Sequence, residues 1–430
     1  MNWLAILLLL VAIYAAIALF VHRSGIYADH IVFYGPIMAI KTARVGFLDH
    51  FRRFSRILRA YASFGVFMVV FISISITIML FFSLHFTLEM RPEPTGIYAP
   101  QNILLLPGIN EYVPSTLAVW FAFVLTIAIH ELGHGILSRV ENIRVKGMGA
   151  LLLVIPIGFF VEPDEEELEK TRGMPKIRMF GAGITNNIVV GVICFAAMIM
   201  LMGAAVPTDE PVIQGVYRNY SADMAGVPPY SVITGIDGME VDNREDVSAV
   251  LDTTHPGEVV TLTVLTGGSE SDYPLMLTEW PEDLGNRSSG FMGIYYYDGA
   301  AVLDVIGESL SPIGYLRLIT IPFDMSLGGQ MLRIVAFDTP DMQFYETPFP
   351  FFWGTIHLLF WCGWININVG IFNAIPMIPL DGGYILKEGV DRLFEGRRVE
   401  KYAAPVVAFV SSLVLVMLIS LILLPYLFAL

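Results

Sequence analysis

The residues of this chain best suited to chemistry are two histidines and a glutamate in the run His130-Glu131-Leu132-Gly133-His134. On an α-helix His130 and His134 lie one turn apart on one face, so both imidazoles can reach the same metal ion. Zinc favours such ligands, and a catalytic zinc site keeps three protein ligands and a position for water. Glu131 projects next to that water and can take its proton. The spacing predicts one Zn²⁺ per chain, with Glu131 as the general base.

A third ligand must come from another part of the chain. The candidate is Asp381, which ends a broken apolar run reading NAIPMIPLDGG over residues 373–383. Pro376 and Pro379 lack a backbone donor and end a helix, which leaves a loop free to bring the carboxylate to the metal. Taken alone, Asp381 is also compatible with a helix cap just outside a membrane, and the two histidines with helix-capping or core residues at the membrane edge.

The surrounding chain is too apolar for a water-soluble enzyme. Of its 430 residues 55% are hydrophobic and only 15% are charged, whereas a soluble domain carries about 25% charge. Two cysteines, both in apolar runs, exclude a disulfide scaffold, and a net charge of −15 is the wrong sign for a nucleic-acid partner. The composition predicts an integral membrane protein.

Six apolar runs are long enough, or nearly so, to cross a bilayer as a helix of about 20 residues. They are Trp3–Val21, Phe64–Phe86, Ser115–Ile129 with its continuation into the 130s, Met179–Val206, Phe349–Leu380 and Tyr402–Leu430. The first has no preceding Lys or Arg, which favours a retained helix over a signal peptide. The predicted fold class is a polytopic α-helical membrane protein with about six transmembrane helices.

Positive charges predict the orientation of these spans. Residues 22–63, 139–178 and 384–401 carry 7, 7 and 5 of the 25 Lys and Arg residues. Cytoplasmic loops are enriched in these residues. We therefore expect a multi-pass protein of the cell membrane, with these three segments in the cytoplasm and both termini outside.

An acidic segment on the outer side is predicted to form a small β-rich domain. Residues 207–300 contain 16 acidic and 3 basic residues and alternate strand-like runs with glycine-bounded turns. The order of these runs resembles a PDZ domain of the kind found in proteases, which implies binding of peptide C-termini or extended segments by strand addition. An inert spacer domain is the alternative.

The expected organisation has five parts. Residues 1–63 hold the first transmembrane helix and a basic cytoplasmic segment. Residues 64–206 form a transmembrane core, in which the short run Met148–Val161 is expected to be re-entrant or interfacial because it is too short to span. The PDZ-like domain occupies 207–300, an amphipathic connector 301–348, and the rest of the transmembrane core 349–430.

The motifs at 130–134 and 373–383, with the PDZ-like insert between them, resemble the site-2 protease family of intramembrane zinc metalloproteases. The resemblance covers most of the chain. It implies that Asp381 is the third zinc ligand, in an active site inside the bilayer near its cytoplasmic side. It also implies hydrolysis of peptide bonds in or near transmembrane segments of membrane-anchored, regulatory proteins.

Two asparagines are further site candidates. Asn373 could donate a hydrogen bond to the scissile carbonyl, or merely bond to backbone freed by the prolines. Family members often have Gly-Pro at the start of the fourth span, followed by an asparagine; here Ile184 replaces the proline, and Asn187 is the candidate contact to substrate or to a ligand.

Two functions from other classes compete with proteolysis. A metal-ion transporter could use the same His and Asp residues, but it would place polar residues along several spans to make a path. A catalytically inactive membrane adaptor could bind peptides through the PDZ-like domain, but it would not need an intact ligand set or the glutamate between the histidines.

Overall fold

The computed structural model describes residues 3–25, 27, 30–103, 105–285 and 287–429. The chain divides into two compact units. The first comprises Met1–Ala196 and Leu358–Leu430, and the second Ala197–His357. Every residue of the predicted metal site belongs to the first unit.

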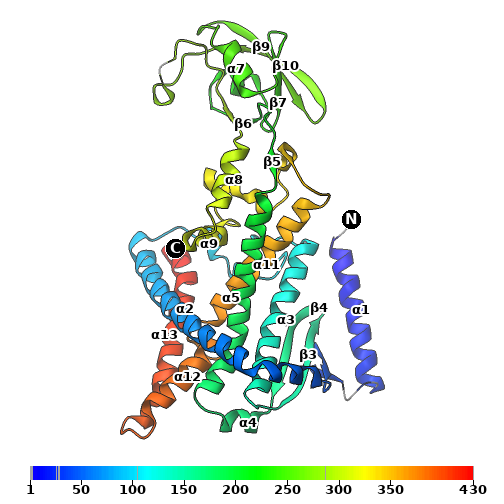
Figure 1. The fold of residues 1–430 in the computed structure, drawn as a ribbon, viewed down its shortest axis with the longest axis vertical. Helices are drawn as coiled ribbons and strands as arrows, with labels where there is room; N and C mark the ends of the chain where they lie inside the picture. The colour runs from blue at the N-terminus through cyan, green and yellow to red at the C-terminus, as the bar shows by residue number, and fades with distance from the viewer. Residues whose placement is uncertain (1–2, 26, 28–29, 104, 286, 430) are drawn as a thin grey trace. The chain divides into compact units, whose positions relative to one another are not determined.

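The first unit is built on long apolar helices (Figure 1). These are α1 (Trp3–Ser24), α2 (Ser55–Met90), α3 (Leu117–Val140), α5 (Met174–Met202), α11 (Phe352–Asn373) and α13 (Ala403–Phe428), with the shorter α12 (Asp381–Phe394) between the last two. Helix α13 packs against α2 and α12, and α2 packs against α3. On α2, Phe64, Phe67 and Phe71 are exposed, as expected for a surface that faces lipid.

Five of these helices are long and apolar enough to cross a membrane. They correspond to the five predicted spans after the first, with candidate bounds Gly46–Met90, Leu117–Val140, Met174–Met202, Phe352–Asn373 and Glu400–Phe428. Within the described residues, α1 contributes a shorter apolar stretch, Val11–Ser24. The chain is thus a membrane protein by its helices, and the sixth span stays a prediction.

A four-stranded antiparallel sheet accompanies these helices. It contains β1 (Ile31–Tyr34), β2 (Ile37–Thr42), β3 (Val145–Leu153) and β4 (Ile155–Pro163), in that order. The run Met148–Val161, predicted to be re-entrant or interfacial, is the β3–β4 hairpin, in which Met148 pairs with Val161. Strand β4 ends the sheet on the side next to α3 (Figure 1). This brings a strand edge close to the predicted metal-binding helix.

The second unit has a β-rich half, as the acidic segment predicted. One sheet has the order β10-β9-β7-β8, and β11 pairs with β6. The elements in chain order are β6 (Ile213–Val216), α6 (Ser221–Ala225), β7 (Val232–Ile236), β8 (Met239–Glu240), α7 (Arg244–Leu251), β9 (Val259–Thr266), β10 (Ser269–Met276) and β11 (Ile294–Tyr296). Fully buried Ile213, Ile233 and Leu262 lie in its core.

The segment after β11 holds three short helices, α8 (Gly299–Gly307), α9 (Pro312–Thr320) and α10 (Leu327–Leu332). Near its end, β12 (Tyr345–Glu346) pairs with β5 (Val206–Pro207). The Tyr297 hydroxyl donates to Asp341 Oδ2 at 2.8 Å and lies 2.8 Å from the Tyr345 hydroxyl. Burial raises the pKa of Tyr345 to about 12, so this hydroxyl stays protonated at neutral pH. The buried network ties the connector to the end of the β-rich half.

Candidate metal centre

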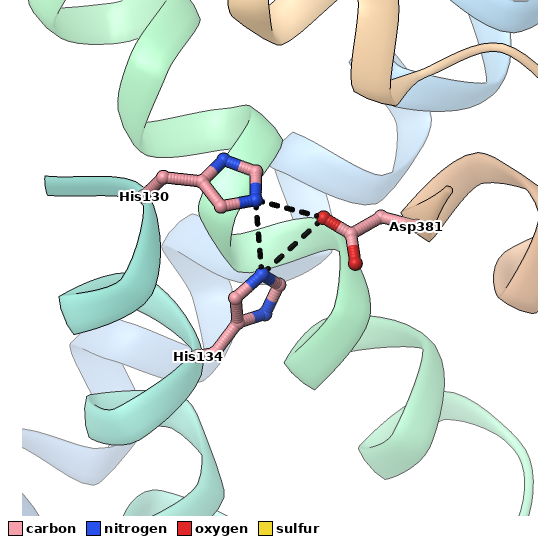
Figure 2. Close-up of side chains that lie close together, drawn as sticks. All are labelled: His130, His134 and Asp381. Carbon is pink, nitrogen blue, oxygen red and sulfur yellow. Dashed lines mark hydrogen bonds and ion pairs between the residues drawn. The ribbon is translucent and has the colours of Figure 1, made fainter. Parts of the chain in front are cut away.

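Three potential metal ligands converge in the first unit (Figure 2). His130 and His134 are on α3, and Asp381 is the first residue of α12. The Nε2 atoms of the two histidines are 3.2 Å apart, and Asp381 Oδ2 lies 3.1 Å from Nε2 of His130 and 3.2 Å from Nε2 of His134. The histidines are only 8% and 9% exposed. The structure therefore brings together the three residues predicted as ligands.

The spacing of these three atoms fits a zinc ion. In a tetrahedral site with zinc–ligand distances of about 2.0–2.1 Å, neighbouring ligand atoms are about 3.3–3.4 Å apart. The three observed separations are 3.1–3.2 Å. Asp381 Oδ2 is buried and accepts no well-aligned hydrogen bond from any residue that the structure describes, which fits three atoms that point at a common position. The donor set, two imidazoles and one carboxylate, is one that catalytic zinc uses.

Asp381 reaches this point because α11 stops early. Helix α11 ends at Asn373, just before Pro376, so the prediction that the prolines end the helix is confirmed. The loop then folds back against the start of α12, where a Cβ on Gly383 would lie 2.4 Å from the Ile378 backbone nitrogen. Only a residue without a side chain permits this approach. The glycines after Asp381 thus hold the loop that positions its carboxylate.

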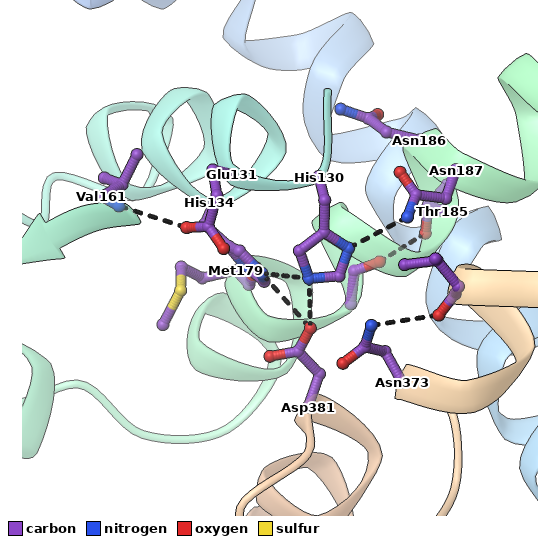
Figure 3. Close-up of polar contacts among 12 residues, drawn as sticks. His130, Glu131, His134, Val161, Met179, Thr185, Asn186, Asn187, Asn373 and Asp381 are labelled. Atoms are coloured by element: carbon purple, nitrogen blue, oxygen red, sulfur yellow. Dashed lines mark hydrogen bonds and ion pairs between the residues drawn. The ribbon is translucent and has the colours of Figure 1, made fainter. Parts of the chain in front are cut away.

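Groups of helix α5 contact Nδ1 of both imidazoles, the ring nitrogens that do not point toward Asp381. His134 Nδ1 lies 2.9 Å from the backbone oxygen of Met179, so Nδ1 carries the hydrogen and Nε2 keeps a lone pair for a metal. His130 Nδ1 lies 3.2 Å from the side-chain amide of Asn187. Asn187, predicted as a contact to substrate or ligand, therefore touches a ligand (Figure 3).

A glycine on the same helix allows this close approach. A Cβ built on Gly183 would lie 2.6 Å from His134 Nε2 and 2.8 Å from His130 Nε2. Real Cβ atoms essentially never come this close to other heavy atoms. The sequence reasoning missed the role of Gly183, although the signal was there as a glycine four residues before Asn187 in a predicted span.

Glu131 is not part of the group of ligand atoms. Its Oε2 accepts a hydrogen bond of 3.1 Å from the backbone N–H of Val161, on the edge of β4 (Figure 3). The sheet therefore fixes one carboxylate oxygen and leaves the other available. This arrangement fits the predicted base, which should stand beside the metal without binding it.

In the described chain, Asn373 bonds to the backbone of its own helix, but not to a carbonyl that the prolines leave free, so neither of its two predicted contacts is seen. Its Nδ2 donates to the backbone oxygen of Val369, one turn earlier in α11, at 3.0 Å. A second N–H of the same amide is left over, since the group has two donors. Asn366, deeper in the same helix, donates to Thr126 of α3 at 2.7 Å, one turn before His130.

Comparison with known proteins places this geometry in a family. The family model described as Peptidase family M50 matches residues 118–418, which include all three ligand candidates. The chain belongs to peptidase family M50. This confirms the resemblance to the site-2 proteases, and the chain is a membrane metalloprotease.

Individual relatives agree with this assignment. A candidate zinc metalloprotease of Rhizobium meliloti (strain 1021) is 23% identical over 379 residues, which cover 74% of this chain and 96% of that protein. The membrane-bound transcription factor site-2 protease homolog of Arabidopsis thaliana is 26% identical over 218 residues, covering 47% of this chain and 40% of that protein. Zinc metalloprotease RasP of Geobacillus kaustophilus (strain HTA426) is 24% identical over 238 residues, or 55% of each protein.

Proposed function

We propose that this M50 peptidase is an intramembrane zinc metalloprotease that hydrolyses peptide bonds in or near transmembrane segments of membrane-anchored, regulatory proteins. The proposal rests on one observation: Nε2 of His130, Nε2 of His134 and Oδ2 of Asp381 lie 3.1–3.2 Å from one another. His130 and His134 lie in the second half of the apolar helix α3, and Asp381 begins α12 just after the loop that follows the apolar helix α11, so a substrate must reach them at or within the bilayer.

The protein residues divide the work of hydrolysis. Zinc, when bound, supplies Lewis acidity that polarises the scissile carbonyl and acidifies water. Glu131 takes the proton of the attacking water and delivers it to the leaving amine. The Val161 N–H holds the Glu131 carboxylate in place during both transfers. The unused amide proton of Asn373 is the proposed donor to the carbonyl oxygen.

The proposed topology has six spans, with the basic loops and the nearby metal centre toward the cytoplasm. Arg139 at the end of α3, next to the motif, forms two hydrogen bonds of 2.7–2.8 Å with Asp49, just before α2. The half of α3 that carries the ligands leads directly into residues 139–178, which hold 7 of the 25 Lys and Arg residues. This supports the assignment of the site to the cytoplasmic side.

The PDZ-like half of the second unit is proposed to bind peptide C-termini or extended segments of substrates. On either side of β11, backbone hydrogen bonds join it to the residues that flank β6. The Tyr217 N–H donates to the Gly293 oxygen, and the Tyr297 N–H donates to the Val212 oxygen. By the alternation of antiparallel strands, the backbone groups of Ile294 and Tyr296 point away from β6. A cavity of about 350 Å³ lies there, lined by residues of α7 and β11. A peptide strand added at this edge could hydrogen-bond to the backbone groups of Ile294 and Tyr296 and place a side chain in the cavity.

Two other functions are less well supported. Transport needs polar groups along a path, whereas the ligand atoms gather at one point beside a glutamate held by Val161. An inactive adaptor has no need for that glutamate or for a zinc-like spacing.

The test separates metal binding from proton transfer. Glu131→Gln keeps size and shape but removes the base, so cleavage of a model membrane peptide should fall by about 10²–10⁴-fold with zinc content near wild type. Asp381→Ala and His134→Ala should lower zinc content itself, because a ligand is lost. Zinc and cleavage are measured on the same purified samples in detergent. Full activity of Glu131→Gln, or full zinc and activity of Asp381→Ala, would contradict the proposal.

A further inference from the structure

Nδ1 of His130, the ring nitrogen that faces away from the other ligands, lies next to the Asn187 side chain, whose amide oxygen lacks a hydrogen-bond donor within the ranges that the structure describes. Asn187 is completely buried, and its Nδ2 lies 3.2 Å from His130 Nδ1. Its Oδ1 is also buried and has no hydrogen-bond partner among the described residues. Leaving a buried acceptor without a donor is destabilising, so this orientation of the amide needs an explanation.

The protonation state that zinc requires supplies one. Nε2 of His130 points toward Asp381 and His134, and a neutral imidazole that binds a metal through Nε2 carries its hydrogen on Nδ1. Two donors, Nδ1–H and the Nδ2 amino group, would then face each other. The oxygen and nitrogen of an amide have nearly the same shape, so their assignment follows from hydrogen bonding. Exchanging them gives Oδ1 a donor and removes the opposed pair.

We propose that Asn187 is a positioning residue for the metal ligand His130, with its Oδ1 accepting the Nδ1–H hydrogen bond. This rests on the proposed zinc site. Of the two roles predicted from the sequence, it selects the contact to a ligand over the contact to substrate. It makes Asn187 the counterpart of the Met179 carbonyl, which lies 2.9 Å from His134 Nδ1. Such partners fix the tautomer and orientation of a ligand, and their loss typically weakens metal affinity about 10–100-fold.

The packing around Asn187 favours this role over substrate contact. A Cβ on Gly370 of α11 would lie 3.4 Å from the Cβ of Asn187, so α11 covers the side chain closely. With no exposed surface, Asn187 cannot be reached by a substrate without movement of α11. Among the described residues, the ring of His130 is the one hydrogen-bonding partner of the Asn187 side chain.

Two variants test the acceptor role. Asn187→Asp keeps an oxygen at the required place, whereas Asn187→Leu keeps a similar volume and removes it. We expect zinc affinity, measured by competition with a chelator on purified full-length protein, to fall about 10–100-fold for Asn187→Leu and to stay within a few-fold of wild type for Asn187→Asp. The absorption spectrum of the Co²⁺-loaded protein should change in Asn187→Leu and remain tetrahedral in Asn187→Asp.

The neighbouring amide provides the matched control. In the described part of the chain, Asn186 accepts a hydrogen bond of 2.9 Å from the Tyr61 hydroxyl and donates one of 3.4 Å to the Ile129 backbone oxygen, but it bonds to neither ligand ring. Asn186→Leu should therefore leave zinc affinity unchanged. Equal zinc affinity of Asn187→Leu and wild type, or an equal loss in Asn187→Leu and Asn187→Asp, would overturn the inference. A wild-type protein that binds zinc tightly but cleaves no membrane peptide would instead refute the proposed protease function, because the affinity pattern does not depend on cleavage.

Discussion

Substitution of Gly183 by alanine should damage the metal centre without touching a ligand. The added Cβ would lie 2.6 Å from His134 Nε2 and 2.8 Å from both Nε2 and Cε1 of His130. Neither ring has room to retreat, since Nδ1 of each is held by α5 itself. Overpacking a buried site costs about 1–3 kcal/mol. If that strain falls on the metal-bound geometry, zinc affinity drops roughly 5- to 150-fold, at 1.4 kcal/mol per tenfold.

The assay is zinc affinity by chelator competition, and the same helix offers a control. A Cβ on Gly181 would meet its nearest neighbour, Val66 of α2, at an ordinary 3.4 Å. Gly181→Ala should therefore bind zinc like wild type, although it makes the same chemical change two residues away. If Gly183→Ala also binds zinc with wild-type affinity, the close approach of α5 is not what shapes the site, and the reasoning from the glycine contact is refuted.

Two further predictions concern the other parts of the chain. Single cysteines introduced at Arg172 and Gly267, in a background without Cys194 and Cys362, should label from opposite faces of the membrane, with Arg172 cytoplasmic; labelling from the same face would refute the six-span topology. Removal of residues 213–296 should leave zinc binding and cleavage of a short generic peptide intact while changing selection among membrane substrates, because no ligand lies there. The Tyr297 N–H donates to the Val212 oxygen at 2.9 Å, so two glycines can join the ends, and loss of zinc from the correctly inserted deletion protein would contradict the prediction.

The spans and the first two ligands could be predicted because their signals are local. Apolar runs of sufficient length become helices in a membrane, since only internal hydrogen bonds can satisfy the backbone there. Residues 130–134 lie in such an apolar run, so the relation between the two histidines follows from helix geometry. The end of α11 before Pro376 is equally local.

The proline-broken run made Asp381 a candidate, but its assignment as the third ligand came from the family resemblance, because nothing local says which distant carboxylate will meet the histidines. The four-stranded sheet could not be predicted from the sequence. Strands β2 and β3 pair Ile40 with Ala150 across the whole of α2 and α3, and the apolar β3–β4 run has no alternation that would distinguish a strand from a short membrane segment. The hydrogen bond from the Val161 N–H to Glu131 could therefore not be predicted from the sequence.

The role of α5 follows from comparing two helix faces. Met179, Gly183 and Asn187 are each four residues apart, so they follow one another along a single face of α5. The histidines have the same spacing on α3. The Met179 carbonyl contacts His134, the Asn187 amide contacts His130, and Gly183 between them leaves room for both rings. The chemistry resides in α3 and at the start of α12, but the orientation of both imidazoles is set by α5, which bears no ligand. Changes along this face should therefore alter metal affinity first and proton transfer only as a consequence, the reverse of what is expected at Glu131.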